Sequence, residues 1–153
     1  MNVESSSFAQ GQPIPQAHTC DGGDTSPGLR WSNVPQGTKT FALIADDPDA
    51  PAGTWVHWVV YNIPANTYEL PAGMQRTATT SAGGQGINDF RRIGYGGPCP
   101  PPGKPHRYFF KLYALDTEVS LKTGPTKKDV EAAMQGHILA TAELMGTYQR
   151  RAR

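Results

Sequence analysis

The sequence predicts a mainly β protein with one helix near the C-terminal end. Three observations carry this prediction: short aromatic and β-branched runs, frequent turn residues between them, and one late segment with helical spacing. The 153 residues include 17 Gly and 14 Pro, which indicates many turns and shaped loops rather than a helical bundle. No strand–helix alternation typical of a doubly wound fold is present. A chain of this length fits one domain, residues 1–153.

Three segments predict strands. Residues 38–45 contain the apolar run FALI, and the strand ends at DDPDAP (residues 46–51), which no strand or helix interior tolerates. Residues 55–63 (WVHWVVYNI) give the strongest signal because they are aromatic and β-branched throughout. Residues 108–115 (YFFKLYAL) predict a third strand, which we expect to extend back to His106.

The predicted helix runs from Thr126 to Gly146. Thr126 is a suitable N-cap, with Asp129 three residues later as in a capping box. One face at helical spacing then carries Val130, Met134, His137, Ile138, Thr141 and Met145. Gly146 is a suitable stop.

Charge and hydropathy exclude some functions. The formal net charge is +1, whereas nucleic-acid-binding proteins usually carry a strong basic excess, so no nucleic-acid partner is expected. No apolar run is long enough to cross a bilayer, so no integral membrane segment is expected. The start of the chain lacks the pattern of a signal peptide. These features predict a cytoplasmic protein.

The two cysteines, Cys20 and Cys99, fit no zinc spacing and no redox motif. In a cytoplasmic chain the first expectation is a pair of reduced thiols. Both cysteines lie in loops rich in Gly and Pro, so a disulfide between them is the alternative.

Two histidines lie in the predicted strands. Because side chains alternate along a strand, His57 is expected to share a face with Trp55, Val59 and Tyr61, and His106 with Tyr108, Phe110 and Leu112. A buried histidine needs hydrogen-bond partners. The nearest suitable carboxylates along the chain are Asp46, Asp47 and Asp49. If the three strands are neighbours, an aspartate, two histidines and a tyrosine converge at one end of the sheet.

The loop before His106, GYGGPCPPPGKP at residues 94–105, could form one side of such a site. Its prolines would make a stiff wall, and its glycine-rich backbone could offer N–H groups to an anion. The alternative is a polyproline II segment on the surface that binds a partner.

Several sequence blocks closely resemble those of phosphatidylethanolamine-binding proteins, in particular the bacterial Raf-kinase-inhibitor-like branch. The blocks are DDPDAP (46–51), HWVVYNIP (57–64) and GYGGPCPPPGKPHRYFFKLYALD (94–116), together with residues 19–31 and 136–148. The resemblance implies a β-sandwich with a large central sheet, a smaller sheet and peripheral helices, including a C-terminal helix. It implies no metal and no cofactor.

The resemblance also implies a ligand-binding pocket. Its residues would be Asp47, His57, Tyr95, Gly97, Pro100, His106 and Tyr108. Tyr95 is similar to an aromatic residue near the rim, and the neighbouring Pro101 and Pro102 leave the register of the wall proline open. Only residues 52–54 separate the DDPDAP block from Trp55, so a pocket tyrosine that eukaryotic members supply from a longer loop is missing.

Together with the donor chemistry of these residues, the resemblance implies a non-catalytic binding module for a small anionic group: phosphate, phosphoethanolamine or carboxylate. Because an ionised Asp47 repels anions, we expect it to orient a histidine and to favour the cationic form of that ring. A protein kinase or protease is a candidate partner, and a homodimer is left open.

The sequence leaves two other readings open. One is a metal-dependent or acid–base hydrolytic enzyme that uses Asp47, His57 and His106. The other is a pure interaction protein whose working surface is the proline-rich loop.

Overall fold

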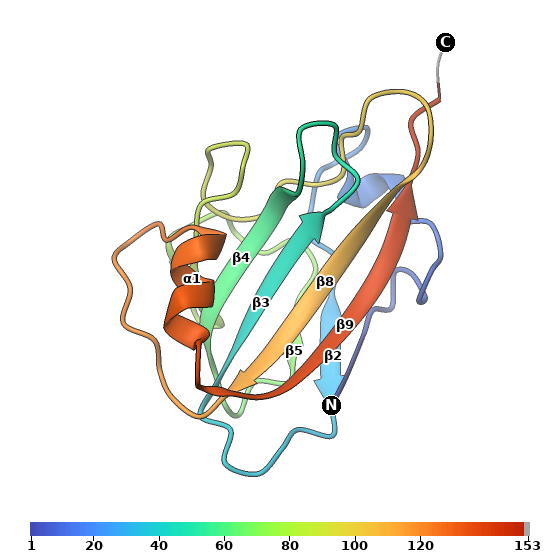
Figure 1. Cartoon of the computed structure of the whole chain (residues 1–153). Coiled ribbons are helices and arrows are strands. Elements are labelled where there is room, and N and C mark those ends of the chain that lie inside the picture. Colours follow the sequence, from blue (N-terminus) through green and yellow to red (C-terminus); the bar gives the residue numbers. More distant parts are fainter. Residues whose placement is uncertain (152–153) are drawn as a thin grey trace.

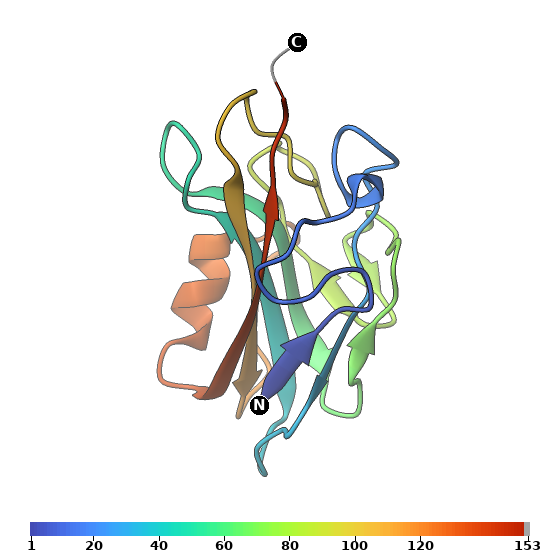
Figure 2. The same cartoon turned by 90° about the vertical axis from the view of Figure 1, so that its right-hand side faces the viewer.

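The computed structural model describes residues 1–151 and is mainly β, as predicted. Two antiparallel sheets pack together, and one helix covers the outer face of the larger sheet (Figure 1). The view from the side shows helix, large sheet and small sheet as successive layers (Figure 2).

The large sheet has the strand order β6-β7-β4-β3-β8-β9, and the small sheet has the order β1-β2-β5. The elements are β1 (Asn2–Glu4), a 3₁₀ turn (Gln16–His18), β2 (Leu29–Ser32), β3 (Thr40–Asp47), β4 (Trp55–Pro64), β5 (Glu69–Leu70), β6 (Thr79–Thr80), β7 (Gly83–Gln85), β8 (His106–Leu115), α1 (Lys127–Met134) and β9 (Ile138–Tyr148). The three predicted strands are confirmed as β3, β4 and β8. The predicted end of the first strand at residue 45 is wrong by two residues, because β3 continues through Asp46 and Asp47.

Strand β3 lies at the centre because both of its faces are covered. Phe41, Leu43 and Ala45 contribute to the core between the two sheets. Ala42 and Ile44 point the other way, into a second core under α1. This arrangement explains why the FALI run is continuously apolar instead of alternating.

The helix prediction is half right. Helix α1 begins after Thr126 with the expected capping box, in which the Thr126 side chain accepts a hydrogen bond from the Asp129 N–H. The helix ends at Met134, and Gly136 has a φ of +83°, which glycine adopts without cost.

The predicted continuation of the helix to Gly146 is wrong, because residues 138–148 form strand β9. This strand pairs antiparallel with β8 from Leu115↔Ile138 to His106↔Tyr148. Between residues 140 and 146, every second residue (Ala140, Ala142, Leu144 and Gly146) is more buried than the residues beside it, which is a period of two. The helix is therefore not the last element of the fold.

Cys20 and Cys99 form a disulfide with a Cα–Cα distance of 5.4 Å, so the expectation of reduced thiols is wrong and the alternative holds. The bond joins the loop after the 3₁₀ turn to the loop that leads into β8. Disulfides are rare in the cytosol outside hyperthermophiles, so this bond weighs against the cytoplasmic prediction. In residues 1–151, no helix is long and apolar enough to span a membrane.

Candidate functional site

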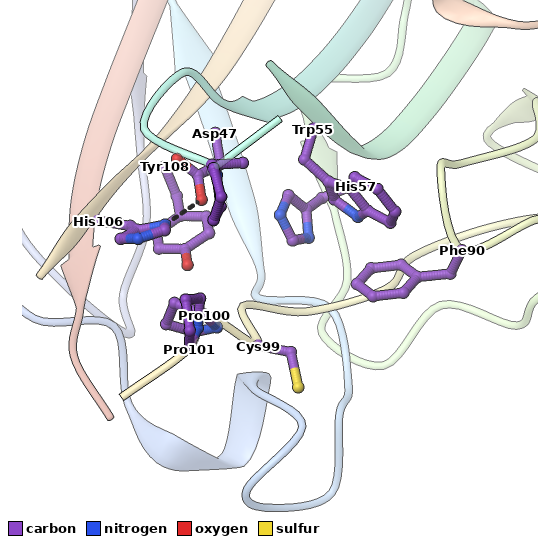
Figure 3. A pocket seen from close by; sticks show the side chains of 11 residues that line it. Asp47, Trp55, His57, Phe90, Cys99, Pro100, Pro101, His106 and Tyr108 are labelled. Atoms are coloured by element: carbon purple, nitrogen blue, oxygen red, sulfur yellow. Dashed lines mark hydrogen bonds and ion pairs between the residues drawn. The ribbon is translucent and has the colours of Figure 1, made fainter. Parts of the chain in front are cut away.

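A cavity of about 190 Å³ opens at one end of the large sheet, where β3 ends and β4 and β8 begin. These ends meet because the strands are antiparallel neighbours: Asp47 pairs with Trp55, and Asp46 pairs with Phe109. The cavity is lined by Asp47, Ala50, Pro51, Trp55, His57, Phe90, Cys99, Pro100, Pro101, His106 and Tyr108 (Figure 3).

A β-bulge aims His57 into this cavity. In the β3–β4 ladder, Ala45 pairs with Trp58 but Asp46 pairs with Val56, so His57 is the extra residue. Bulges of this kind re-aim side chains. The predicted shared face of His57, Val59 and Tyr61 is therefore wrong: Val59 and Tyr61 belong to the second core, whereas the His57 ring packs against Tyr108 at a centroid distance of 5.2 Å.

Strand β8 has no such interruption at this end, and its predicted alternation is confirmed. His106, Tyr108, Phe110 and Leu112 are all buried on one face. The Tyr108 ring lies between the two imidazoles, with centroid distances of 5.2 Å to His57 and 6.5 Å to His106. The two distant histidines therefore meet at one cavity.

Asp47 orients a histidine, and that histidine is His106. Its Oδ2 accepts a hydrogen bond from His106 Nδ1 at 2.7 Å, inside a buried environment. Its Oδ1 accepts the backbone N–H of Asp49 at 2.7 Å. Both carboxylate oxygens are thus engaged, and the remaining ring nitrogen of His106, Nε2, has no hydrogen-bond partner among residues 1–151.

His57 is held differently, by a neutral group. Its Nδ1 lies 2.6 Å from the carbonyl oxygen of Gly96. Because a carbonyl oxygen only accepts, Nδ1 carries the proton in this bond. Burial lowers the pKa of His57 below its usual 6.5, although the bond to Gly96 and the charge of Asp47 act in the opposite direction. The neutral ring therefore leaves its other nitrogen, Nε2, without a proton.

Tyr108 supplies a third polar group. Its hydroxyl is buried and has no hydrogen-bond partner in the described part of the chain. Burial, together with the negative charge of Asp47, raises the pKa of Tyr108 above its usual value. The hydroxyl therefore stays protonated and can donate a hydrogen bond to a ligand.

Two residues of the predicted pocket lie behind it rather than in it. Tyr95 is buried, donates its hydroxyl proton to the His18 carbonyl at 2.7 Å and packs edge-on against Trp58, so it is not at the rim. The N–H of Gly97 donates to Asp24 Oδ1 at 2.8 Å, and the N–H of Gly96 donates to the His57 carbonyl at 2.9 Å. Neither glycine N–H is free to bind an anion.

Pro100 and Pro101 both line the cavity. The disulfide fixes this wall, because Cys99 immediately precedes Pro100 and is bonded to Cys20. The backbone of Cys20 adds a hydrogen bond to the Pro98 carbonyl at 3.1 Å.

Sequence reasoning missed Phe90. Its ring lies 5.5 Å from His57 and 5.4 Å from Trp55, and it lines the cavity. The turn that carries it is shaped by Asn88, whose Oδ1 accepts the Phe90 N–H at 2.9 Å and whose Nδ2 donates to the Gly94 carbonyl at 2.9 Å. An Asn-Asp pair is a turn signal, but it does not show which cavity the next side chain enters.

The rim segment that carries Ala50 and Pro51 is held to strand β8 by an ion pair. Arg107 bonds Asp49 through its backbone N–H at 3.0 Å and through Nε and Nη2 at 2.9 Å each. The side-chain hydrogen bond from Arg107 is the main reason why the pKa of Asp49 falls from 3.8 to about 2. This pair holds the short loop that carries Ala50 and Pro51.

Asp46 points to the opposite face of β3. Its Oδ2 accepts hydrogen bonds from Lys127 Nζ at 2.8 Å and from Lys111 Nζ at 3.3 Å. The first bond attaches the start of α1 to the same strand end that carries Asp47. Asp46 thus bonds the helix on one face of β3, and Asp47 lines the cavity on the other face.

The three residues of the enzyme alternative, Asp47, His57 and His106, do line one cavity. In residues 1–151, however, no group of three His, Cys, Asp or Glu side chains is placed to hold a metal ion. Asp47 and His106 bond each other instead of facing a common point.

The fold and site define a β-sandwich protein with one small pocket at the strand ends, built from an Asp–His pair, a second histidine and a tyrosine. The chain belongs to the phosphatidylethanolamine-binding protein family, whose model matches residues 4–149. The resemblance seen in the sequence is thereby confirmed.

Relatives and solved structures support this assignment. A UPF0098 protein of Aquifex aeolicus is 55% identical over 152 residues, which cover 98% of this chain and 89% of the relative. A UPF0098 protein of Methanothermobacter thermautotrophicus is 48% identical over 98% of this chain and 99% of its own length.

Two crystal structures have the same fold. Escherichia coli YbcL, described as a member of the mammalian family, has a TM-score of 0.90 and 40% identity over 98% of both chains. CT736 of Chlamydia trachomatis, described as a homologue of these proteins, has a TM-score of 0.88 and 44% identity over 97% of both chains.

Proposed function

We propose that this protein is a non-catalytic binding module that holds one small oxyanion in the cavity between His57 and His106. The oxyanion would be a phosphoryl or carboxylate group of a lipid headgroup or of a modified partner protein. One observation carries the proposal: His57, His106 and Tyr108 line one cavity, and the His106 Nε2 and the Tyr108 hydroxyl have no hydrogen-bond partner among residues 1–151.

The chemistry of the lining supports an anionic ligand despite the presence of Asp47. That carboxylate is occupied by His106 and by the Asp49 N–H, so it faces protein donors. Asp47 holds Nδ1 of His106, and Nε2 of this ring has no hydrogen-bond partner among residues 1–151. The Tyr108 hydroxyl is a donor, and hydrogen bonds to charged groups contribute about 1.5–3 kcal/mol each.

The size of the cavity limits the ligand. A volume of about 190 Å³ holds several water molecules, at roughly 30 Å³ each, and therefore a headgroup but not a whole lipid. A few charge-assisted bonds, reduced by the cost of association, predict roughly micromolar to millimolar affinity for a lone phosphate. The apolar walls formed by Trp55, Phe90 and Pro100 can contact a nonpolar substituent.

Hydrolytic chemistry has less support. The cavity lining contains no serine or threonine, and its one cysteine, Cys99, is bound in the disulfide. An acid–base pair without a nucleophile would have to activate water. We therefore place the binding function first.

Modulation of a kinase or protease is the finer part of the proposal. The cavity opens between two rim segments, one with Ala50 and Pro51 and one with Pro100 and Pro101. A phosphorylated side chain of a partner protein that enters the cavity would bring the partner surface against both segments.

The test is isothermal titration calorimetry with inorganic phosphate and with phosphoethanolamine, on the wild type and on His106→Ala. We expect His106→Ala to lower the affinity at least tenfold, because one charge-assisted bond of about 1.5–3 kcal/mol is lost. His137→Ala is the matched control, because His137 makes the same kind of Nδ1–carboxylate bond to Asp116 at 2.8 Å, in an exposed position. Unchanged phosphate binding by a folded His106→Ala variant would contradict the proposal.

A further inference from the structure

We propose that the Cys20–Cys99 disulfide is a redox switch for the cavity: it fastens the proline wall formed by Pro100 and Pro101, and its reduction lowers the affinity for a ligand. The inference rests on the proposed function and adds the regulation of the same site. It follows from the way in which the wall segment, residues 98–102, is attached to the rest of the protein.

The wall segment has the sequence PCPPP and therefore almost no backbone hydrogen-bond donors. Proline lacks an N–H group, so Cys99 carries the single donor, and its N–H has no hydrogen-bond partner among residues 1–151. The Pro98 carbonyl accepts from the Cys20 N–H at 3.1 Å, and Arg150 Nη1 lies 3.9 Å from Cys99 Sγ. Beyond the first residue, the disulfide is thus the strongest attachment of the wall.

The flanks of the wall segment are anchored without the disulfide. On one side, the Gly97 N–H donates to Asp24 Oδ1 at 2.8 Å. On the other side, Gly103 donates its N–H to the Arg150 carbonyl at 3.0 Å and accepts from Gln149 Nε2 at 2.6 Å. Breaking the disulfide therefore frees the wall between two flanks that stay in place.

The disulfide lies at the cavity and within reach of solvent. Cys99 lines the cavity next to the two prolines (Figure 3), and Pro100 is buried. Cys20 and Cys99 are themselves exposed, so a reductant in solution reaches the bond while the protein is folded. Exposed disulfides are the ones that are readily reduced.

Reduction by a dithiol proceeds by two exchange steps. One thiolate of the dithiol attacks a sulfur of the Cys20–Cys99 bond and forms a mixed disulfide, and the other thiolate then displaces the protein sulfur. The dithiol ends as a disulfide, and both cysteines end as thiols that carry the electrons and protons given up by the dithiol.

The free energy of ordering the wall couples the disulfide to the ligand. In the reduced protein the ligand must order residues 99–102 as it binds, which costs conformational entropy. We expect phosphoethanolamine to bind roughly fivefold more weakly to the reduced than to the oxidised protein. Linkage requires the reverse effect, so a bound ligand should favour the disulfide by the same factor.

Calorimetric titration of the oxidised and of the dithiothreitol-reduced wild type with phosphoethanolamine measures this ratio. Cys20→Ser, which cannot form the bond, should bind as weakly as the reduced wild type and should not respond to dithiothreitol. Arg150→Ala is the matched control, because it removes the other contact of Cys99 Sγ but keeps the bond, and it should keep the wild-type ratio. Thermal unfolding in each redox state establishes that the protein is folded.

A second measurement follows the bond instead of the ligand. The wild type is equilibrated with mixtures of reduced and oxidised dithiothreitol, and the fraction of disulfide is measured with and without saturating phosphoethanolamine. The ligand should shift this equilibrium about fivefold toward the disulfide. An equilibrium that the ligand does not move would overturn the inference.

The outcomes separate the two proposals. Equal affinity of the oxidised and the reduced wild type for phosphoethanolamine, lost in His106→Ala, overturns the switch and leaves the binding function intact. Unfolding of the reduced protein without denaturant also overturns the switch, because the bond then maintains the whole fold. Failure of both redox forms to bind phosphoethanolamine at millimolar concentration overturns the binding function, and the switch with it.

Discussion

The carboxylate of Asp47 accepts a 2.7 Å hydrogen bond from His106 at the edge of the cavity, and both residues are buried. Because the negative charge of Asp47 repels an anion, Asp47 can favour anion binding only through the histidine that it holds. A substitution that removes the charge of Asp47 but keeps its shape tests this role.

Asp47→Asn keeps a hydrogen-bond acceptor for His106 but removes the charge. We expect phosphate affinity at pH 7 to fall about tenfold, the equivalent of about 1.4 kcal/mol, because a neutral amide holds the His106 ring through a weaker hydrogen bond than a carboxylate does. Asp116→Asn, which alters the exposed pair with His137, should leave the affinity unchanged. Calorimetry checks both variants, and tighter binding by Asp47→Asn would mean that Asp47 acts mainly by repelling the ligand.

The Asp49–Arg107 pair predicts a pH dependence of stability at the rim. The pKa of Asp49 is lowered from 3.8 to about 2, so the folded state favours the ionised carboxyl. The stabilisation is complete above about pH 4 and is lost as the pH falls toward 2. ¹³C NMR titration should show Arg107→Ala restoring the Asp49 pKa toward 3.8.

Arg30→Ala is the control for this titration. Arg30 bonds Glu4 at 2.7 Å on the small sheet, where both side chains are exposed. This change should leave the Asp49 titration as in the wild type. An Asp49 pKa that stays near 2 in Arg107→Ala would show that another group holds the carboxyl ionised.

Removal of the disulfide should lower the stability of the protein. Cys20 and Cys99 are 79 residues apart in sequence, and closing a long loop restricts the unfolded chain. Cys20→Ser should lower the free energy of unfolding by about 2–4 kcal/mol, as measured by urea denaturation. Reductant should produce a similar loss in the wild type and none in the variant. A wild type that is insensitive to reductant under denaturing conditions would indicate that no bond forms.

A substitution at Gly97 should impair packing rather than ligand binding. A Cβ atom at this position would lie 2.2 Å from the His18 carbonyl oxygen and 2.5 Å from Asp24 Oδ1. Gly97→Ala should therefore lower the free energy of unfolding by about 1–3 kcal/mol, the usual cost of overpacking. Gly23→Ala, in the neighbouring loop, meets no atom closer than 3.7 Å and should cost much less. Equal stability of the two variants, again by urea denaturation, would contradict this role.

The parts of the fold that were predictable depend on local signals. Strands β3, β4 and β8 carry dense aromatic and β-branched runs, and the start of α1 carries its cap in Thr126. Strand β9 was not predictable in this way, because its small and apolar residues satisfy a period of two as well as the helical spacing. Pairing with the long strand β8 makes this segment a strand instead of a helix, and that pairing cannot be read from a single sequence.

The site, like the fold, has a part that the sequence predicted and a part that it did not. Asp47, His57, His106 and Tyr108 were predictable because they stand at strand ends in recognisable blocks. The aim of His57 depends on a bulge in the β3–β4 ladder. The places of Tyr95 and Gly97 depend on contacts with residues 18–24, far away in sequence. Such contacts follow from tertiary packing, which motif spacing does not encode.

The end of β3 is anchored on both faces, through Asp46 to Lys127 of the helix and through Asp47 to His106 of the cavity. Amide hydrogens at this strand end should therefore exchange with solvent only when large parts of the sheet open together. A ligand in the cavity would meet a floor that is already rigid, so the entropy lost on binding would come mainly from the ligand itself.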